Sequence, residues 1–244
     1  MTNRPQAEHR VLLPGTGSMR LAVALLAAFV LTLIASCGSG FTSNQQESLP
    51  DGNKLLADSA AAMRSVNSIH FTLSAQGDTP GVSLRYADGE LTEKGAAKGV
   101  ARVQQQDGKV VQQEFVITGD TLYLRDPASG NYQKMPASMA GVSYNPSTIL
   151  NPNQGLAAVI ASGRDAKATA HEKIVGVDTY RVEATFPQQP LSTLLPGTRG
   201  DSDGTMWIGT QDSRLVTAQF RLGDGLATVR FSNYNTPVTI NTPV

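Results

Sequence analysis

The feature that most constrains the fold is a period-two alternation of apolar and polar residues, which returns in successive runs from residue 69 onward. Ile69-His70-Phe71-Thr72-Leu73-Ser74-Ala75 is one such run, and residues 180–186 repeat the pattern. Side chains alternate between the two faces of a β-strand, so this spacing predicts half-buried strands with one apolar face. Because turn signals separate the runs, we expect the chain to meander from each strand to an adjacent one.

The turn signals are short pairs rich in Gly and Asp. Asp88-Gly89, Asp107-Gly108 and Gly119-Asp120 are predicted turns in the first half, and Asp212-Ser213 and Gly223-Asp224-Gly225 in the second. Between them we expect about ten short strands. These strands lie over residues 69–75, 82–86, 101–103, 110–117, 121–125, from 166, 180–186, 205–209, 215–222 and 227–233.

Helical spacing interrupts the strands at a few places. Asp51 can cap a helix in which Leu56, Ala60 and Met63 share one face. Further helical segments are expected at 147–150, 156–160 and 190–195. Many short strands with few helices predict an α+β fold, in which an antiparallel sheet carries its helices on one face.

The N-terminal region holds an apolar run that ends at the only cysteine. Residues 21–34 form about 14 apolar positions, fewer than the roughly 20 that span a bilayer, behind a flank with three arginines. Ile34-Ala35-Ser36-Cys37 has the pattern of a bacterial lipobox, whose cysteine sulfur receives a diacylglycerol. The alternative is a short membrane anchor with an incidental cysteine. We therefore expect a signal peptide over 1–36, a flexible tether over 37–50 and one domain over 51–244, with Met19 as an alternative start.

Charge and cysteine content exclude several classes of protein. The first 36 residues hold three of the 20 basic and one of the 20 acidic side chains, which leaves the remaining chain with a net charge near minus two. That balance disfavours a nucleic-acid binder, which normally has a basic face. A single cysteine, Cys37, cannot form an internal disulfide.

Residues with catalytic or metal-binding chemistry are few. His70 and His171 are predicted to be solvated, and the sequence has no His or Cys spacing typical of zinc, so we expect no metal and no cofactor. Residues 141–145 resemble a serine nucleophile elbow without its second glycine, and residues 201–204 resemble the start of a calcium loop without its glutamate. Trp207 is expected in the core. The protein is therefore predicted not to be an enzyme.

Several segments resemble the actinobacterial lipoprotein family of LppX, LprA, LprF and LprG. They are the helix leading into Ile69-His70-Phe71, the hairpin at 119–124, the segment 147–156 (STILNPNQGL), Trp207-Ile208 and the ending Pro237-Val238-Thr239. The family usually has Asp where Asn151 stands. The resemblance implies a half-barrel, that is, a strongly curved antiparallel sheet with helices over its concave face and an apolar cavity between them. It also implies binding of acylated glycolipids and their transport toward the outer envelope, without catalytic residues.

Strand phase indicates which residues would line such a cavity. A lipid with two acyl tails has about 30 methylenes, and exposing them to water would cost on the order of 25 kcal/mol, so a carrier must enclose them. A tightly packed dry core explains the same residues as well as a cavity does, and the resemblance favours the cavity. The candidate lipid-binding residues are Phe71, Leu73, Leu84, Tyr86, Phe115, Ile117, Ile149, Leu150, Val159, Ile160, Tyr180, Val182, Phe186, Phe220 and Phe231.

Three hypotheses follow for the function. The first is a carrier that is anchored through lipidated Cys37 on the extracytoplasmic face of the cell membrane. Its partners would be an acylated lipid or glycolipid and an exporter or acceptor protein of the envelope, with no nucleic acid. The second is a non-catalytic anchored scaffold of an envelope complex, and the third is an anchored enzyme with an unrecognised site.

Overall fold

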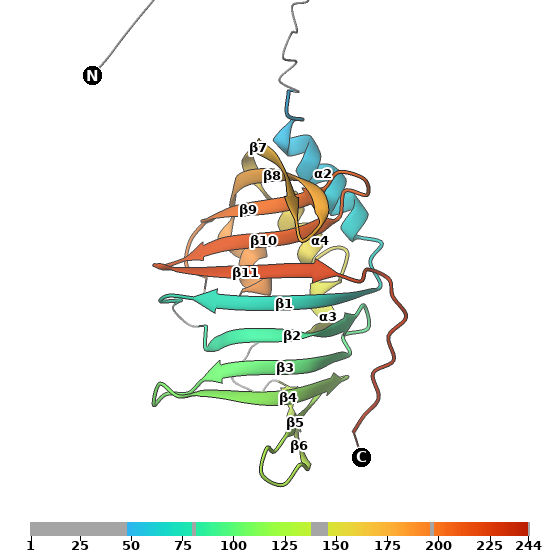
Figure 1. Ribbon diagram of the computed structural model, residues 1–244, viewed down its shortest axis with the longest axis vertical. Helices are drawn as coiled ribbons and strands as arrows, with labels where there is room; N and C mark the ends of the chain where they lie inside the picture. Colours follow the sequence, from blue (N-terminus) through green and yellow to red (C-terminus); the bar gives the residue numbers. More distant parts are fainter. Residues whose placement is uncertain (1–47, 80–81, 138–145, 196–197, 244) are drawn as a thin grey trace, which may run out of the picture. The chain divides into compact units, whose positions relative to one another are not determined.

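The core of the fold is an eleven-stranded sheet with every neighbouring pair antiparallel (Figure 1). A computed structural model describes residues 48–79, 82–137, 146–195 and 198–243. The strand order is β6-β5-β4-β3-β2-β1-β11-β10-β9-β8-β7. The strands are β1 Ser68–Gln76, β2 Leu84–Thr92, β3 Ala97–Gln104, β4 Val110–Thr118, β5 Thr121–Arg125, β6 Tyr132–Pro136, β7 Arg164–Ile174, β8 Val177–Phe186, β9 Ser202–Gly209, β10 Leu215–Leu222 and β11 Gly225–Ser232.

Two meanders make up this sheet, as the alternating runs predict. Strands β1 to β6 form one meander and β7 to β11 the other, and the two join where β1 pairs with β11, with Phe71 opposite Phe231. The chain between β6 and β7 therefore connects the two opposite edges of the sheet. The helices α3 and α4 lie in that connection.

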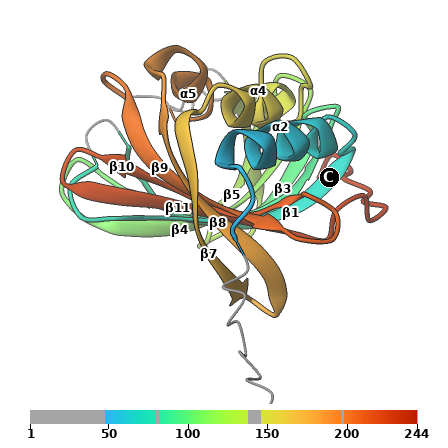
Figure 2. The ribbon, with the colours of Figure 1, turned by 90° about the horizontal axis from the view of Figure 1, so that it is seen from above.

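The described helices lie on one face of the sheet, which we call the inner face (Figure 2). Asp51 caps α2 as predicted, because the Lys54 N–H donates to its Oδ1 at 2.8 Å. The helix expected at 190–195 begins two residues earlier, at Gln188 after Pro187. The helices are α2 Gly52–Met63, α3 Pro146–Ile149, α4 Leu156–Ala161 and α5 Gln188–Leu194.

The predicted turn at Asp88-Gly89 is wrong, because both residues lie inside β2. Gly89 is opposite Gly99 of β3, and a Cβ added to Gly99 would lie 2.1 Å from the Asp88 carbonyl oxygen. Glycine is therefore needed here for a close approach between two strands. The turn comes later, where Gly95 has a φ of +79°.

The predicted strong curvature is also wrong, since the sheet is open and not strongly curled. A barrel closes by pairing its edge strands, yet β6 pairs only with β5 and β7 only with β8. Local bulges occur in β2, β7 and β10 without bringing the edges together. The α+β class and the placement of helices over one face are as expected.

Candidate functional site

The inner face under α2, α4 and α5 is a filled apolar core. Phe186 and Phe220 meet edge to face with their ring centroids 5.3 Å apart, above Gly204, where an added Cβ would touch both rings at 2.9 Å. Side chains therefore occupy this part of the interior, as the dry-core alternative predicts. The candidate lipid-binding residues that are buried in this core are Ile149, Leu150, Val159, Ile160, Val182, Phe186, Phe220 and Phe231.

A second part of the inner face, over β1 to β4, is apolar, and its large side chains are half buried beside the buried Ala87 and Gly89. Phe71 and Phe115 lie in one cross-strand row with Gly89 and Gly99 between them. The neighbouring row places Leu73 beside Ala87 and Ala101. We call these seven residues, Phe71, Leu73, Ala87, Gly89, Gly99, Ala101 and Phe115, the inner-face strip.

The inner-face strip has large side chains at its borders and small ones between them. Phe71, Leu73 and Phe115 are half buried, and Phe71 and Phe115 pack against the buried core with one side. Ile117, another candidate lipid-binding residue, extends the border one row further, opposite Ala97. An alkyl chain on this strip would contact aromatic rings at the sides and backbone below.

The small members of the strip are functional candidates that the sequence reasoning did not identify. Ala87, Gly89, Gly99 and Ala101 share the inner phase of two neighbouring strands. The signal was available as period-two spacing of small residues, but Asp88-Gly89 also matches a turn motif. Only the strand register distinguishes the two interpretations, because the register depends on the β3 partner.

Two further candidates from β2 lie on different faces, although the sequence places them in one phase. A bulge between Leu84 and Tyr86 shifts the register, so Leu84 lies opposite inner-facing Val103. Tyr86 lies opposite Arg102 on the outer face, with that guanidinium carbon 5.0 Å from the ring centroid. Tyr86 was therefore wrongly placed on the apolar face that the helices cover.

Tyr180, Trp207 and His70 each have a polar or ionisable neighbour. Tyr180 packs against the core, and its ring lies 5.1 Å from that of His171. Trp207 was expected in the core, but it lies opposite Arg181 on the outer face, where its Nε1–H donates to Glu172 Oε1 at 2.8 Å. His70 Nε2 is 3.4 Å from Asp88 Oδ2.

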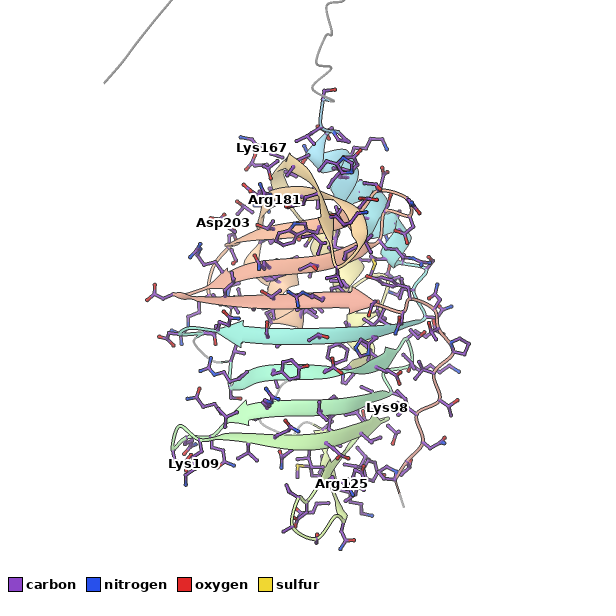
Figure 3. The ribbon with its side chains drawn as sticks, viewed as in Figure 1. Lys98, Lys109, Arg125, Lys167, Arg181 and Asp203 are labelled. Carbon is purple, nitrogen blue, oxygen red and sulfur yellow. The ribbon has the colours of Figure 1, made fainter. Side chains whose placement is uncertain are left out.

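The outer face of the sheet carries many polar and charged side chains (Figure 3), and several of them form ion pairs. Lys98 contacts Glu90 at 3.1 Å across β2 and β3, and Arg125 contacts Glu114 at 3.0 Å. Alternation with the apolar inner residues puts these charges in solvent. The two faces therefore differ sharply in chemistry, and an acyl chain would be accommodated only on the inner one.

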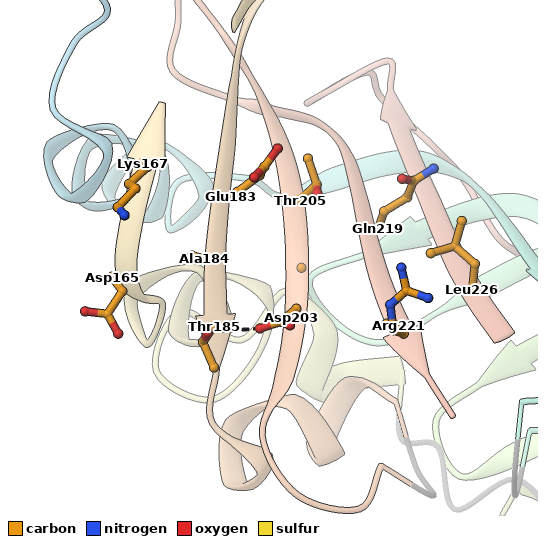
Figure 4. Close-up of a pocket in the computed structure, with 11 residues that line it drawn as sticks. Asp165, Lys167, Glu183, Ala184, Thr185, Asp203, Thr205, Gln219, Arg221 and Leu226 are labelled. Atoms are coloured by element: carbon orange, nitrogen blue, oxygen red, sulfur yellow. Dashed lines mark hydrogen bonds between the residues drawn. The ribbon is translucent and has the colours of Figure 1, made fainter. Parts of the chain in front are cut away.

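Two hollows found in the described residues lie away from the candidate lipid-binding residues. One, of about 400 Å³, is on the outer face over β7 to β11 and is lined mostly by charged and polar side chains (Figure 4). There the Thr185 hydroxyl donates to Asp203 Oδ1 at 3.0 Å. The other, of about 260 Å³, lies between α2 and α4 near Leu56 and Gly163. None of the fifteen candidate residues lines either hollow.

The weak motifs of the sequence have structural explanations where they are described. Asp201 Oδ1 accepts the Gln188 N–H at 3.0 Å, and residues 202–204 begin β9, so this segment is a strand start. Among the described residues, no group of three His, Cys, Asp or Glu side chains could hold a metal ion. Residues 141–145 and Cys37 lie outside the described residues. Each helix in the described part of the chain is too short or too polar to cross a bilayer.

Two described groups, Tyr234 and Asp126, have shifted pKa values. Burial raises the pKa of Tyr234, whose hydroxyl donates to the Leu215 carbonyl oxygen, and the charge of Asp212 raises it further. The backbone N–H groups of Ala128 and Ser129 lower the pKa of Asp126 in the β5–β6 turn. Neither group faces the inner-face strip, so recognition there rests on apolar contact.

The fold and the site define an α+β domain with one apolar, partly accessible sheet face under helices. Two solved structures share this architecture. The crystal structure of LprF from Mycobacterium bovis matches with a TM-score of 0.72 and 26% identity, covering 79% of this chain and 96% of that one. That of LppX from Mycobacterium tuberculosis matches with a TM-score of 0.58 and 24% identity, covering 77% and 98%.

Sequence comparison identifies the family. The profile of the LppX_LprAFG lipoprotein family matches residues 51–240. The chain is also 33% identical to the lipoarabinomannan carrier protein LprG of Mycolicibacterium smegmatis, over 92% of this chain and 97% of that protein. The chain belongs to the LppX_LprAFG lipoprotein family, which confirms the resemblance seen in the sequence. The family is non-catalytic, so the protein is not an enzyme, and a lipoprotein family implies membrane anchoring.

Proposed function

We propose that the protein is a membrane-anchored carrier that binds acylated lipid or glycolipid against its inner face and carries it from the plasma membrane toward the outer cell envelope. The observation that carries this proposal is the inner-face strip, where Phe71, Leu73 and Phe115 stay half buried on the side of the sheet that the helices cover. A relative with 33% identity is named as a lipoarabinomannan carrier.

The energetics require more apolar enclosure than the strip alone provides. Moving two acyl tails from the bilayer into water would cost about 25 kcal/mol of free energy. A pocket that encloses both tails needs a volume of roughly 1,000 Å³. We therefore place the tails along the inner-face strip and beneath the helix layer, in an apolar cavity that opens as lipid enters. The helices α3 and α4 lie in the connection between the two edges of the sheet, outside the strand pairing, so a shift of these helices would leave the sheet intact.

The anchor determines where such a carrier would work. In this proposal Cys37 bears the lipid, on the extracytoplasmic side, and residues 38–50 are a tether of about 20 Å. Two or three acyl chains hold a protein persistently at a membrane. The domain would thus take lipid from the adjacent leaflet and pass it to an acceptor or exporter protein of the envelope.

A pair of neighbouring substitutions tests the site. Ala101→Phe adds a ring inside the inner-face strip, whereas Val100→Phe adds one on the outer face of the same strand, opposite Asp88. We expect the first variant to lose roughly tenfold of its lipid occupancy and the second to keep it, since about 1.4 kcal/mol of lost contact is tenfold in affinity. Native mass spectrometry of the purified protein measures the occupancy, and circular dichroism checks the fold.

The outcomes separate the hypotheses. Equal lipid occupancy in both variants would show that the lipid does not bind at the inner-face strip. If the unsubstituted protein, purified from an envelope-producing host, carries no lipid but retains a defined protein partner, the scaffold hypothesis would replace the carrier.

A further inference from the structure

Exposed large apolar side chains are few in the described ranges, and two of them are close together. They are Leu49 at 38%, Val110 at 53%, Val175 at 76% and Val177 at 43% exposed. Val175 and Val177 flank Gly176 in the turn between β7 and β8. The end of this hairpin, residues 174–177 (Ile-Val-Gly-Val), which we call the β7–β8 tip, is therefore apolar and faces solvent.

The backbone conformation at the β7–β8 tip is one that valine rarely adopts. Val175 has a φ of +49° and Gly176 one of +84°, as in a two-residue hairpin turn that favours Asn-Gly or Gly-Gly. A β-branched residue is the most strained choice for a left-handed conformation. Since three quarters of Val175 is in solvent, packing within the domain does not offset that strain.

The β7–β8 tip lies on the same side of the sheet as the start of the described chain. Figure 2 shows the hairpin below the sheet, opposite the helices, and the first described residues lead to that side as well. Leu49, another of the four exposed apolar side chains, belongs to this first described segment and follows Cys37 by only 12 residues. With the tether of the proposed function, which would span about 20 Å, an anchored domain would keep this side near the bilayer.

We propose that the β7–β8 tip is a second membrane contact, in which Val175 and Val177 enter the interfacial region of the lipid bilayer that holds Cys37. The proposal rests on the lipid anchor in the proposed function and adds an orientation to it. Lys173 at the base of the tip is paired with Asp178 at 3.4 Å, so the contact is mainly apolar.

A small apolar contact suffices because the anchor makes it intramolecular. Two valines give only weak binding to a membrane from free solution. A short flexible tether raises the effective concentration of the tip at the surface to the millimolar range, so a weak contact becomes populated. A second copy of the chain or a protein partner would instead cover the tip without any dependence on lipid.

A fluorescent label measures the environment of the tip directly. The full chain is expressed so that it is processed and lipidated, with Val175→Cys or Val110→Cys as a thiol for the polarity-sensitive dye NBD. Val110 is a matched control, because it is also an exposed valine in a hairpin. Its neighbour Lys109 lies at the opposite end of the sheet (Figure 3). Each protein is reconstituted into vesicles of phosphatidylethanolamine and phosphatidylglycerol.

We expect blue-shifted emission, quenched by doxyl-labelled lipid, from position 175 and water-like emission from position 110. Adding Val177→Asp should reverse the blue shift at 175. Water-like emission at position 175 in vesicles would overturn the inference. A blue shift at position 175 in a sample without vesicles or detergent would also overturn it, because a second protein copy would then cover the tip. Lipid occupancy of the same samples by mass spectrometry tests the carrier function separately. If Cys37 of the unsubstituted chain takes the dye, the anchor is absent and this inference fails with it.

Discussion

Single residues decide how much of the inner face can be reached. Gly89 and Gly99 let β2 and β3 approach closely, since a Cβ on either would lie 2.4 or 2.1 Å from a carbonyl oxygen of the other strand. As a result, the central row of the inner face between Phe71 and Phe115 has no side chains above the backbone. Gly204 has the opposite role, because its missing side chain lets Phe186 and Phe220 fill the core.

Tyr234 makes the stability of the domain sensitive to alkaline pH. Burial raises its pKa above the ordinary value of 10.0, so the folded state holds its proton where the unfolded chain releases it. This contribution is complete below pH 10 and is lost as the pH rises above it. Tyr234→Phe should lower the free energy of unfolding by about 1 kcal/mol at pH 7, through loss of the hydrogen bond to Leu215, but flatten the decline above pH 10.

Urea unfolding at pH 7 and at several values above pH 10 measures both effects. Tyr123→Phe, in β5, is the matched control for the removal of one tyrosine hydroxyl. An identical slope in the Tyr234→Phe variant and the unsubstituted protein would contradict this role for Tyr234.

At the scale of elements, local signals placed most strands and helices correctly. The helix α2 begins after Asp51 as its capping pattern predicts, and the Asp107-Gly108 and Gly119-Asp120 pairs lie between the expected strands. The sequence reasoning missed β6, Tyr132–Pro136, because five residues with a proline at the end show little alternation. This strand depends on pairing with β5 at the sheet edge.

The cap of α2 can be weighed against a surface ion pair on the same helix. Asp51→Ala removes an acceptor for the Lys54 N–H, so the free energy of unfolding should fall by about 1 kcal/mol. Asp58→Ala removes only the exposed contact with Lys54 Nζ at 2.6 Å and should cost less than about 0.5 kcal/mol. Chemical denaturation of the two variants compares them, and an equal or larger loss for Asp58→Ala would show that the cap is unimportant.

At the scale of the whole molecule, anchoring and fold are separate properties. The structure describes one compact unit after residue 47, so we expect the domain to fold without the anchor. Cys37→Ser should move the protein from the membrane to the soluble fraction and abolish labelling by radioactive palmitate. The double variant Cys37→Ser with Ser39→Cys keeps a thiol outside the lipobox and should behave in the same way. Membrane retention of either variant, measured by fractionation, would indicate an uncleaved apolar anchor.

The sequence by itself determined most strands, most turns, the helix cap and the class of fold, because period-two spacing and capping residues act over a few neighbouring positions. The tertiary structure decided which apolar side chains fill the core and which stay half buried. It also decided the face of Tyr86, through a bulge, and the openness of the sheet, through its unpaired edges. These features depend on pairing between strands that are distant in sequence, such as β1 with β11, and no local pattern encodes that pairing.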